Sequence, residues 1–192
     1  MRSLATWRRF GSEAAGPWRS PDFGEEPSFF HNASVAKNYW LMKSEPAEVS
    51  VDDALAAPKS TVPWTGVRNY QARNFMRDGM QVGDGVLFYH SSCAEPGIVG
   101  VARVTSSAYP DPTQFERKSP YFDPASKRES PRWLLVDVQV LHKTRNLTLP
   151  ELRADPALQD LVVLRKGNRL SITPVEPAHW KRILKLLDVP SR

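Results

Sequence analysis

Strict alternation over residues 132–141 is the feature that most constrains the fold. Every second residue from Leu134 to Val140 is apolar, whereas Asp137 and Gln139 between them are polar. Successive side chains of a strand point to opposite faces. The pattern therefore predicts an antiparallel strand with one face in the core and the other in solvent.

The other predicted elements are short. Strands are predicted at residues 39–43, 86–90, 98–105 and 170–173. Two helices are predicted at residues 51–57 and 69–78, and a third begins after the capping pattern at Thr148. A fourth is predicted from its apolar face, formed by Trp180, Ile183, Leu184 and Leu187. Residues 106–131, rich in Pro, Ser and Asp, predict a long surface loop. Without a regular βαβ rhythm, we expect an α+β fold: a small, curved, largely antiparallel β-barrel with peripheral short helices.

The charge of the chain is unevenly distributed. Residues 1–36 lack periodicity, and we interpret them as a disordered extension ahead of one domain at residues 37–192. The extension holds four arginines and four acidic residues, so the net charge of +5 belongs to the domain. A basic domain is suited to binding phosphate. The Arg-rich start MRSLATWRRF leaves an organellar presequence as an alternative to a cytoplasmic location.

Several functional classes lose support because their motifs are missing. The sequence has no GxGxxG, GxxxxGK[ST], GxSxG or HExxH motif and no HxE…PCxxC deaminase signature. Its four histidines and single cysteine, Cys93, lack metal-ligand spacing, so we expect neither a metal nor a cofactor. No apolar run is long enough for a membrane helix. We therefore favour binding over catalysis.

Three short segments combine small polar groups with aromatic residues at predicted strand ends. They are residues 43–46 (KSEP), 64–69 (WTGVRN) and 89–91 (YHS). A base pocket needs a flat apolar wall, donors and acceptors at the base edge, and positive charge for phosphate. Trp64 is the candidate wall, and Glu45 or Asn69 could bind an exocyclic amine. The phosphate candidates are Arg68, Arg73 and Arg77.

Each candidate also has a purely structural interpretation. Trp64 could be a core residue, and Glu45 could end a strand or pair with Lys43. Asn69 could be the N-cap of its helix. The arginines of the predicted helix at 69–78 could form a solvated face.

Seven segments of the chain resemble the EVE domain, a family of the PUA-like superfamily that is related to YTH and ASCH domains. They occur in the order of the family and cover nearly the whole chain from residue 39 to residue 187. The segments are YWLMKSEP (39–46), WTGVRNYQARNFMR (64–77), GDGVLFYHS (83–91), GIVGV (97–101), YPDPTQF (109–115), PRWLLVDV (131–138) and RLSITPV (169–175).

The resemblance implies a PUA-like twisted β-barrel that binds a modified base of DNA or RNA in an aromatic pocket. By analogy with YTH domains, Glu45 would contact the base edge and Trp64 would form a cage wall. YTH domains have an amide at the position of Glu45. An ionised carboxylate only accepts hydrogen bonds, which suits the exocyclic amine of cytosine. Our hypothesis is therefore a cytosine-type base.

Further pocket candidates come from the matched segments. The full predicted set is Lys43, Ser44, Glu45, Trp64, Thr65, Asn69, Tyr89, His90, Ser91, Trp133 and Ser171. We expect a monomeric, non-enzymatic reader of nucleic acid, in the nucleus of a eukaryote or at the nucleoid of a bacterium. One alternative is hydrolysis of a modified nucleoside such as acylated cytidine, as in some ASCH-type relatives, with Lys43 and Glu45 on one strand face. Another is RNA binding without modification specificity.

Overall fold

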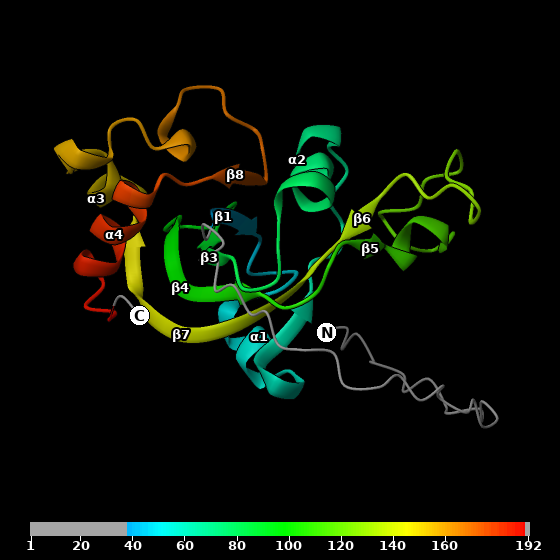
Figure 1. Cartoon of the computed structure of the whole chain (residues 1–192), viewed down its shortest axis with the longest axis horizontal. Coiled ribbons are helices and arrows are strands. Elements are labelled where there is room, and N and C mark those ends of the chain that lie inside the picture. The colour runs from blue at the N-terminus through cyan, green and yellow to red at the C-terminus, as the bar shows by residue number, and fades with distance from the viewer. Residues whose placement is uncertain (1–37, 191–192) are drawn as a thin grey trace, which may run out of the picture. The chain divides into compact units, whose positions relative to one another are not determined.

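The computed structural model describes residues 38–190, so the expectations about residues 1–36 lie outside the described part. Six strands form one sheet in the order β2-β7-β4-β3-β1-β8 (Figure 1). They are β1 (Tyr39–Ser44), β2 (Thr61–Pro63), β3 (Gly85–His90), β4 (Gly97–Val104), β7 (Asp137–Thr148) and β8 (Ile172–Pro174). A separate pair joins β5 (Tyr109–Pro110) to β6 (Leu134–Leu135).

The sheet is curved and largely antiparallel, as predicted. Within residues 38–190 the exception is β1, which runs parallel to β3 with Ser44 as the register partner of His90. β4 shifts register against β7 between Ile98 and Gly100, and again just after Val101. Such irregularities increase the local bend and twist of a strand. Figure 1 shows β7 curving around the sheet.

Both faces of the sheet are buried at its strands β1 and β3. In β1, Trp40 and Met42 belong to one apolar cluster, whereas Leu41 between them belongs to a second cluster. In β3, Phe88 lies in the first cluster and Tyr89 in the second. This double burial explains why β1 and β3 have continuous apolar sequences, unlike the alternating β7.

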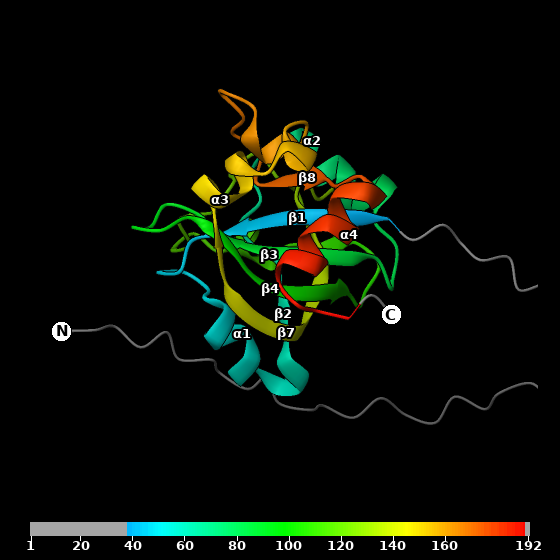
Figure 2. The ribbon, with the colours of Figure 1, turned by 90° about the vertical axis from the view of Figure 1, so that its left-hand side faces the viewer.

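In the described part of the chain, four short α-helices surround the sheet: α1 (Val51–Ala56), α2 (Tyr70–Asn74), α3 (Leu149–Ala154) and α4 (Pro177–Leu186). Two of the predicted helices begin with full capping boxes, with Ser50 capping α1 and Thr148 capping α3. α4 buries its apolar face in the second cluster, and Figure 2 shows it lying across the sheet. No helix in the described residues is long and apolar enough to cross a bilayer.

The predicted helix at 69–78 divides into two parts. α2 ends at Asn74, and residues Phe75–Gly79 form a wider π-helical turn, in which the amide of Met80 donates to the carbonyl of Phe75 at 2.8 Å. Gly79, the last residue of this π-turn, passes the Trp40 ring closely. A π-turn of this kind is an interruption that periodicity alone does not predict.

The 106–131 segment is more ordered than the surface loop that we predicted. A 3-10 turn at Pro112–Phe115 carries the fully buried Gln114. The Gln114 amide donates to the carbonyls of Asp111 (2.7 Å) and Trp133 (2.8 Å), and its Oε1 accepts from the Trp133 backbone amide at 3.0 Å. One buried side chain thereby ties the loop to β6.

Candidate functional site

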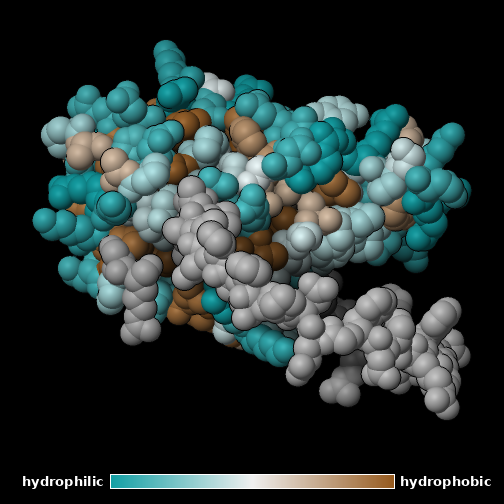
Figure 3. Space-filling model, in the orientation of Figure 1, coloured by the Kyte–Doolittle hydropathy of each residue, from teal (hydrophilic) through white to brown (hydrophobic). Residues whose placement is uncertain are grey.

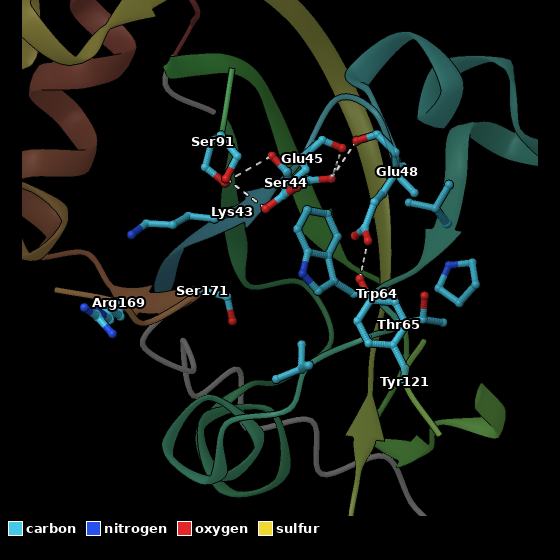
Figure 4. Close-up of a pocket in the computed structure, with 16 residues that line it drawn as sticks. Lys43, Ser44, Glu45, Glu48, Trp64, Thr65, Ser91, Tyr121, Arg169 and Ser171 are labelled. Atoms are coloured by element: carbon cyan, nitrogen blue, oxygen red, sulfur yellow. Dashed lines mark hydrogen bonds between the residues drawn. The ribbon is translucent and has the colours of Figure 1, made fainter. Parts of the chain in front are cut away.

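A cavity of about 580 Å³ opens where β1 and β3 end (Figure 4). Its lining comes from segments far apart in the sequence: the end of β1 and the turn after it, β2 and the following loop, residues 91–92, Tyr121, and residues 169–171. Parallel pairing brings the carboxyl ends of β1 and β3 to the same edge of the sheet. Side chains that follow these two strands therefore converge.

Hydrogen bonds hold the two strand ends together. The amide of Ser91 donates to the carbonyl of Ser44 at 2.9 Å. The hydroxyl of Ser92 donates to Glu45 Oε1 at 2.8 Å, and the Ser44 hydroxyl donates to the carbonyl of Val49 at 2.6 Å. The Glu45 carboxylate is thus oriented at the pocket, with acceptor capacity left over.

Trp64 forms an apolar wall of the cavity. Its side chain belongs to the first core cluster and is only 6% exposed, yet it lines the cavity. The ring meets Phe88 edge to face, with 5.1 Å between the centroids, and its backbone amide donates to the carbonyl of Val136 at 2.9 Å. Core packing therefore fixes a flat aromatic surface that a planar ligand could stack on.

Tyr121 brings a second aromatic ring to the cavity. Its phenol donates a hydrogen bond to Glu48 (Figure 4). Burial, followed by that hydrogen bond, raises the pKa of Tyr121 to about 12. The phenol is therefore neutral at physiological pH. It joins the 106–131 loop to the turn after β1.

A partly buried ion pair supports the loop between Trp64 and Asn69. Arg68 donates to Asp111 at 2.8 Å and to the carbonyl of Tyr121 at 2.5 and 2.9 Å, and the Gly66 amide also donates to Asp111 at 3.0 Å. Burial raises the pKa of Asp111. Hydrogen bonds from Thr113, Arg68 and Gly66 outweigh that effect and lower this pKa below its ordinary value. Asp111 is ionised and holds the pocket loop and Tyr121 in one arrangement.

The structure brings together seven of the eleven predicted pocket residues. The cavity lining includes Lys43, Ser44, Glu45, Trp64, Thr65, Ser91 and Ser171. Lys43 and Glu45, the residues considered for hydrolysis, share the lining but form no ion pair with each other in the described structure. The remaining four predicted residues have structural contacts outside the lining.

Two of those four lie on β3. Tyr89 faces the second core cluster, on the side of the sheet opposite to Phe88. His90 Nε2 accepts a hydrogen bond from the Val51 amide at 3.1 Å, at the start of α1. Burial lowers the pKa of His90; nearby Asp52 raises it and Lys143 lowers it by smaller amounts. The neutral imidazole thus accepts a hydrogen bond from the first residue of α1.

The other two also have structural partners. Asn69 caps α2 by accepting from the Ala72 amide at 3.1 Å. The Trp133 indole donates to Asp123 at 2.8 Å, and its ring packs on Tyr70 with 4.9 Å between centroids. Trp133 therefore anchors the 106–131 loop, while Tyr121 supplies the second aromatic ring.

The predicted phosphate candidates are engaged with the protein. Arg68 is paired with buried Asp111, and Arg77 is paired with Asp78 at 2.7 Å on the surface. Arg73 donates to the carbonyl of Arg132 at 2.9 Å and lies over the ring of Tyr70. None of the three lines the cavity.

The prediction missed Glu48 and Tyr121, and it gave Arg169 no role. The one local signal for Glu48 is its position three residues after Glu45, in the turn that follows β1. Tyr121 carries no local signal because its hydrogen-bond partners, Arg68 and Glu48, lie 53 and 73 positions away. Within residues 38–190, no group of three His, Cys, Asp or Glu side chains is arranged to hold a metal ion.

Comparison with known proteins gives one consistent result. A family model described as EVE domain matches residues 38–186. Thymocyte nuclear protein 1 of Mus musculus is 40% identical over 176 residues, covering 83% of this chain and 77% of that protein. The crystal structure of human THYN1 protein in complex with 5-methylcytosine containing DNA is 40% identical with a TM-score of 0.74, covering 81% of this chain and 100% of that chain. The structure of a Leishmania major protein is 46% identical with a TM-score of 0.74, covering 79% and 95%.

Proposed function

The chain belongs to the EVE domain family, and from this premise we propose that it binds DNA and recognises a modified cytosine in the cavity beside Trp64. The observation that carries the proposal is the pairing of an aromatic wall with a carboxylate in one cavity. Trp64 offers a planar apolar surface, and Glu45 offers acceptor oxygens at the end of β1. Stacking of a base on an aromatic ring contributes about 1–3 kcal/mol.

The chemistry of the lining favours a base with an exocyclic amine, such as cytosine, over thymine. An acidic side chain accepts from the N4 amine of cytosine but has no acceptor-to-donor match with the O4 of thymine. The relative human THYN1 was crystallised with DNA that contains 5-methylcytosine. A carboxylate beside an aromatic wall suits the same base in this chain.

The position of Trp64 constrains how a base would enter. Because the ring is 6% exposed and faces a cavity, a base within an intact duplex has no access to it. The bound base must therefore come from a single strand or be extruded from the duplex, at a cost of a few kcal/mol. A DNA-directed role places the protein with the genome, in a nucleus or at a nucleoid. Relatives such as that of Mus musculus are named as nuclear proteins.

The test is binding to matched oligonucleotides at fixed salt, in single- and double-stranded DNA and in RNA. One position carries cytosine, 5-methylcytosine, adenine or N6-methyladenine, and the rest of the sequence is constant. We expect at least a tenfold preference, about 1.4 kcal/mol, for 5-methylcytosine in DNA. Equal affinity for all bases, with steep salt dependence, would contradict the proposal.

Two variants separate the pocket from the fold. Trp64→Ala leaves a cavity in the core and costs about 3–5 kcal/mol of stability, so its loss of binding is ambiguous by itself. Trp64→Phe keeps an aromatic surface of reduced area and should retain the base preference at lower affinity. Arg77→Gln, on the exposed end of the π-turn, is the control and should bind like the wild type.

A separate experiment tests for hydrolysis. Incubation of the protein with N4-acetylcytidine should leave the nucleoside unchanged, since we propose a reader and not a hydrolase.

A further inference from the structure

Lys43 and Arg169 flank the same side of the cavity. The amide of Lys43 donates to the carbonyl of Ser171 at 2.7 Å, which fixes the end of β1 against the residues that precede β8. Both side chains line the cavity. Figure 4 shows both lying on the side of Ser171, away from Tyr121 and Glu48. The two cations therefore lie on one side of the cavity and the Glu48 carboxylate on the opposite side.

Neither cation has an acidic partner in the described part of the chain. No ion pair of Lys43 or Arg169 is formed within 4.0 Å among residues 38–190. The carboxylates of the cavity are engaged elsewhere, Glu45 with Ser92 and Glu48 with Tyr121. Burial lowers the pKa of Lys43, because its ammonium group is half-buried without a countercharge. An anion bound beside it would offset that desolvation.

The positive charge continues along an ordered turn outside the cavity. Residues 165–169 (RKGNR) carry Arg165 and Lys166, both exposed, and residues 161–170 contain no acidic residue. Gly167 has a φ of +78°, a conformation that favours glycine. The Asn168 side chain donates to the carbonyl of Val162 at 3.0 Å and accepts from the Leu170 amide at 3.0 Å. Figure 1 shows this loop projecting before β8, and Figure 3 shows hydrophilic side chains at the same place.

We propose that Lys43 and Arg169 bind the phosphate adjacent to the recognised base, and that Arg165 and Lys166 bind the neighbouring phosphate of the same strand. We call these four residues the phosphate clamp. This inference rests on the base-binding function proposed above and deepens it. Arginine and lysine are the usual phosphate ligands, and charge-assisted hydrogen bonds to phosphate are stronger than neutral ones. With its base beside Trp64 and Glu45, a nucleotide would place its phosphate on the cationic side. The backbone contacts then lie at the 165–169 turn, whereas Arg68 and Arg77 remain structural.

The test uses single-stranded DNA with one 5-methylcytosine and a single uncharged methylphosphonate, moved one phosphate at a time. We compare the wild type with Arg169→Gln and Lys43→Met, and use Arg77→Gln as the charge-matched control. Arg169→Gln should weaken binding roughly tenfold and reduce the slope of log K against log salt by about 0.7. At one phosphate next to the modified base, the methylphosphonate should weaken binding by the wild type by a similar factor. The same methylphosphonate should weaken binding by Arg169→Gln little further.

Several outcomes would overturn the clamp. They are wild-type affinity in both variants, an equal methylphosphonate effect in wild type and Arg169→Gln, or a lower salt slope in Arg77→Gln alone. Arg169 is exposed, so its variant tests the clamp even if Lys43→Met fails to fold. Tighter binding of 5-methyl-2′-deoxycytidine monophosphate than of its nucleoside would show that the site holds a free nucleotide phosphate as well as one in a strand.

Failure of the clamp and failure of the reader function are distinguishable. The clamp binds a group that every nucleotide shares, so Arg169→Gln should keep the wild-type ratio of affinities for 5-methylcytosine and cytosine. If the wild type itself lacks that preference, the reader function fails. The methylphosphonate positions and salt slopes still decide on the clamp.

Discussion

Gly66 lies directly against the ring of Tyr121: a Cβ at this position would come within 2.7 Å of Tyr121 Cζ. The φ of Gly66 is +82°, so an L residue is disfavoured here for its backbone as well. Gly66→Ala should therefore displace Tyr121 and weaken oligonucleotide binding. The left-handed backbone should also cost about 1–2 kcal/mol of unfolding free energy.

The matched control is Gly83→Ala. Gly83 also has a positive φ, +98°, but a Cβ there meets no atom within 4 Å. Gly83→Ala should lose a similar amount of stability in urea unfolding and keep full binding. If the two variants bind equally well, the contact between Gly66 and Tyr121 is irrelevant to the pocket.

Asp111→Asn should destabilise the fold strongly. The Asp111 carboxylate is fully buried and accepts from Arg68, Gly66 and Thr113. Asparagine removes the charge that Arg68 faces and turns an NH₂ group toward donors. Removing one partner of a fully buried ion pair costs about 3–5 kcal/mol, and because the Arg68 side chain is 21% exposed the loss should lie toward the lower end of that range. Urea unfolding measures the loss. Asp78→Asn, which breaks an exposed pair with Arg77, should change stability little, and a comparable loss there would contradict this account.

Glu45→Gln should reduce discrimination between 5-methylcytosine and thymine. The two bases share the 5-methyl group and differ at the 4-position, an amine in one and a carbonyl in the other. A glutamine can turn its NH₂ group toward the carbonyl, whereas the carboxylate of Glu45 cannot. We expect the affinity ratio to fall roughly tenfold, since one base contact contributes about 1–3 kcal/mol of discrimination. Glu129→Gln, an exposed residue of the 106–131 loop, alters the net charge equally and should leave the ratio unchanged.

The stability of the protein should decrease below neutral pH because of His90. Its pKa in the folded state is lowered, so the unfolded chain takes up the proton first. The stabilisation is present above the unfolded pKa of about 6.5 and is lost as pH falls toward the folded pKa. His90→Gln keeps an acceptor for the Val51 amide without a titrating ring. The variant should show a shallower decline of unfolding free energy below pH 6.5.

The pH experiment needs a histidine control. His142→Gln removes an exposed histidine of β7 and leaves the contact between His90 and Val51 intact. A His90→Gln curve that runs parallel to the wild type below pH 6.5 would show that His90 is not the titrating group.

Local patterns predicted the parts of the fold that depend on neighbouring residues. The helix start at residue 51, the capping box at Thr148 and the buried face of α4 are confirmed because each involves residues within a few positions of one another. The register of β1 beside β3 was not predicted, since parallel pairing joins distant segments through backbone groups alone.

The candidate site could be predicted only in part for the same reason. Residues 43–45 and 64–65 lie at the ends of strands and meet at the cavity. Arg68 resembled a phosphate ligand because its partner, Asp111, lies 43 positions away. Tyr121 reaches the cavity through a loop that is organised by buried Gln114, and a polar residue in a Pro- and Ser-rich stretch gives no sign of burial.

The position of β8 at the edge of β1 has a consequence for the synthesis of the chain. β1 is made early, but its outer edge is covered only when Ile172–Pro174 pair with it. Until then, a strand that is apolar on both faces presents unpaired backbone groups, the condition under which chains associate edge to edge. A ribosome that stops before residue 172 would release an aggregation-prone product. Of the strands in residues 38–190, β8 emerges last and protects the nascent protein, directly after Arg169 and Ser171 of the cavity lining have been made.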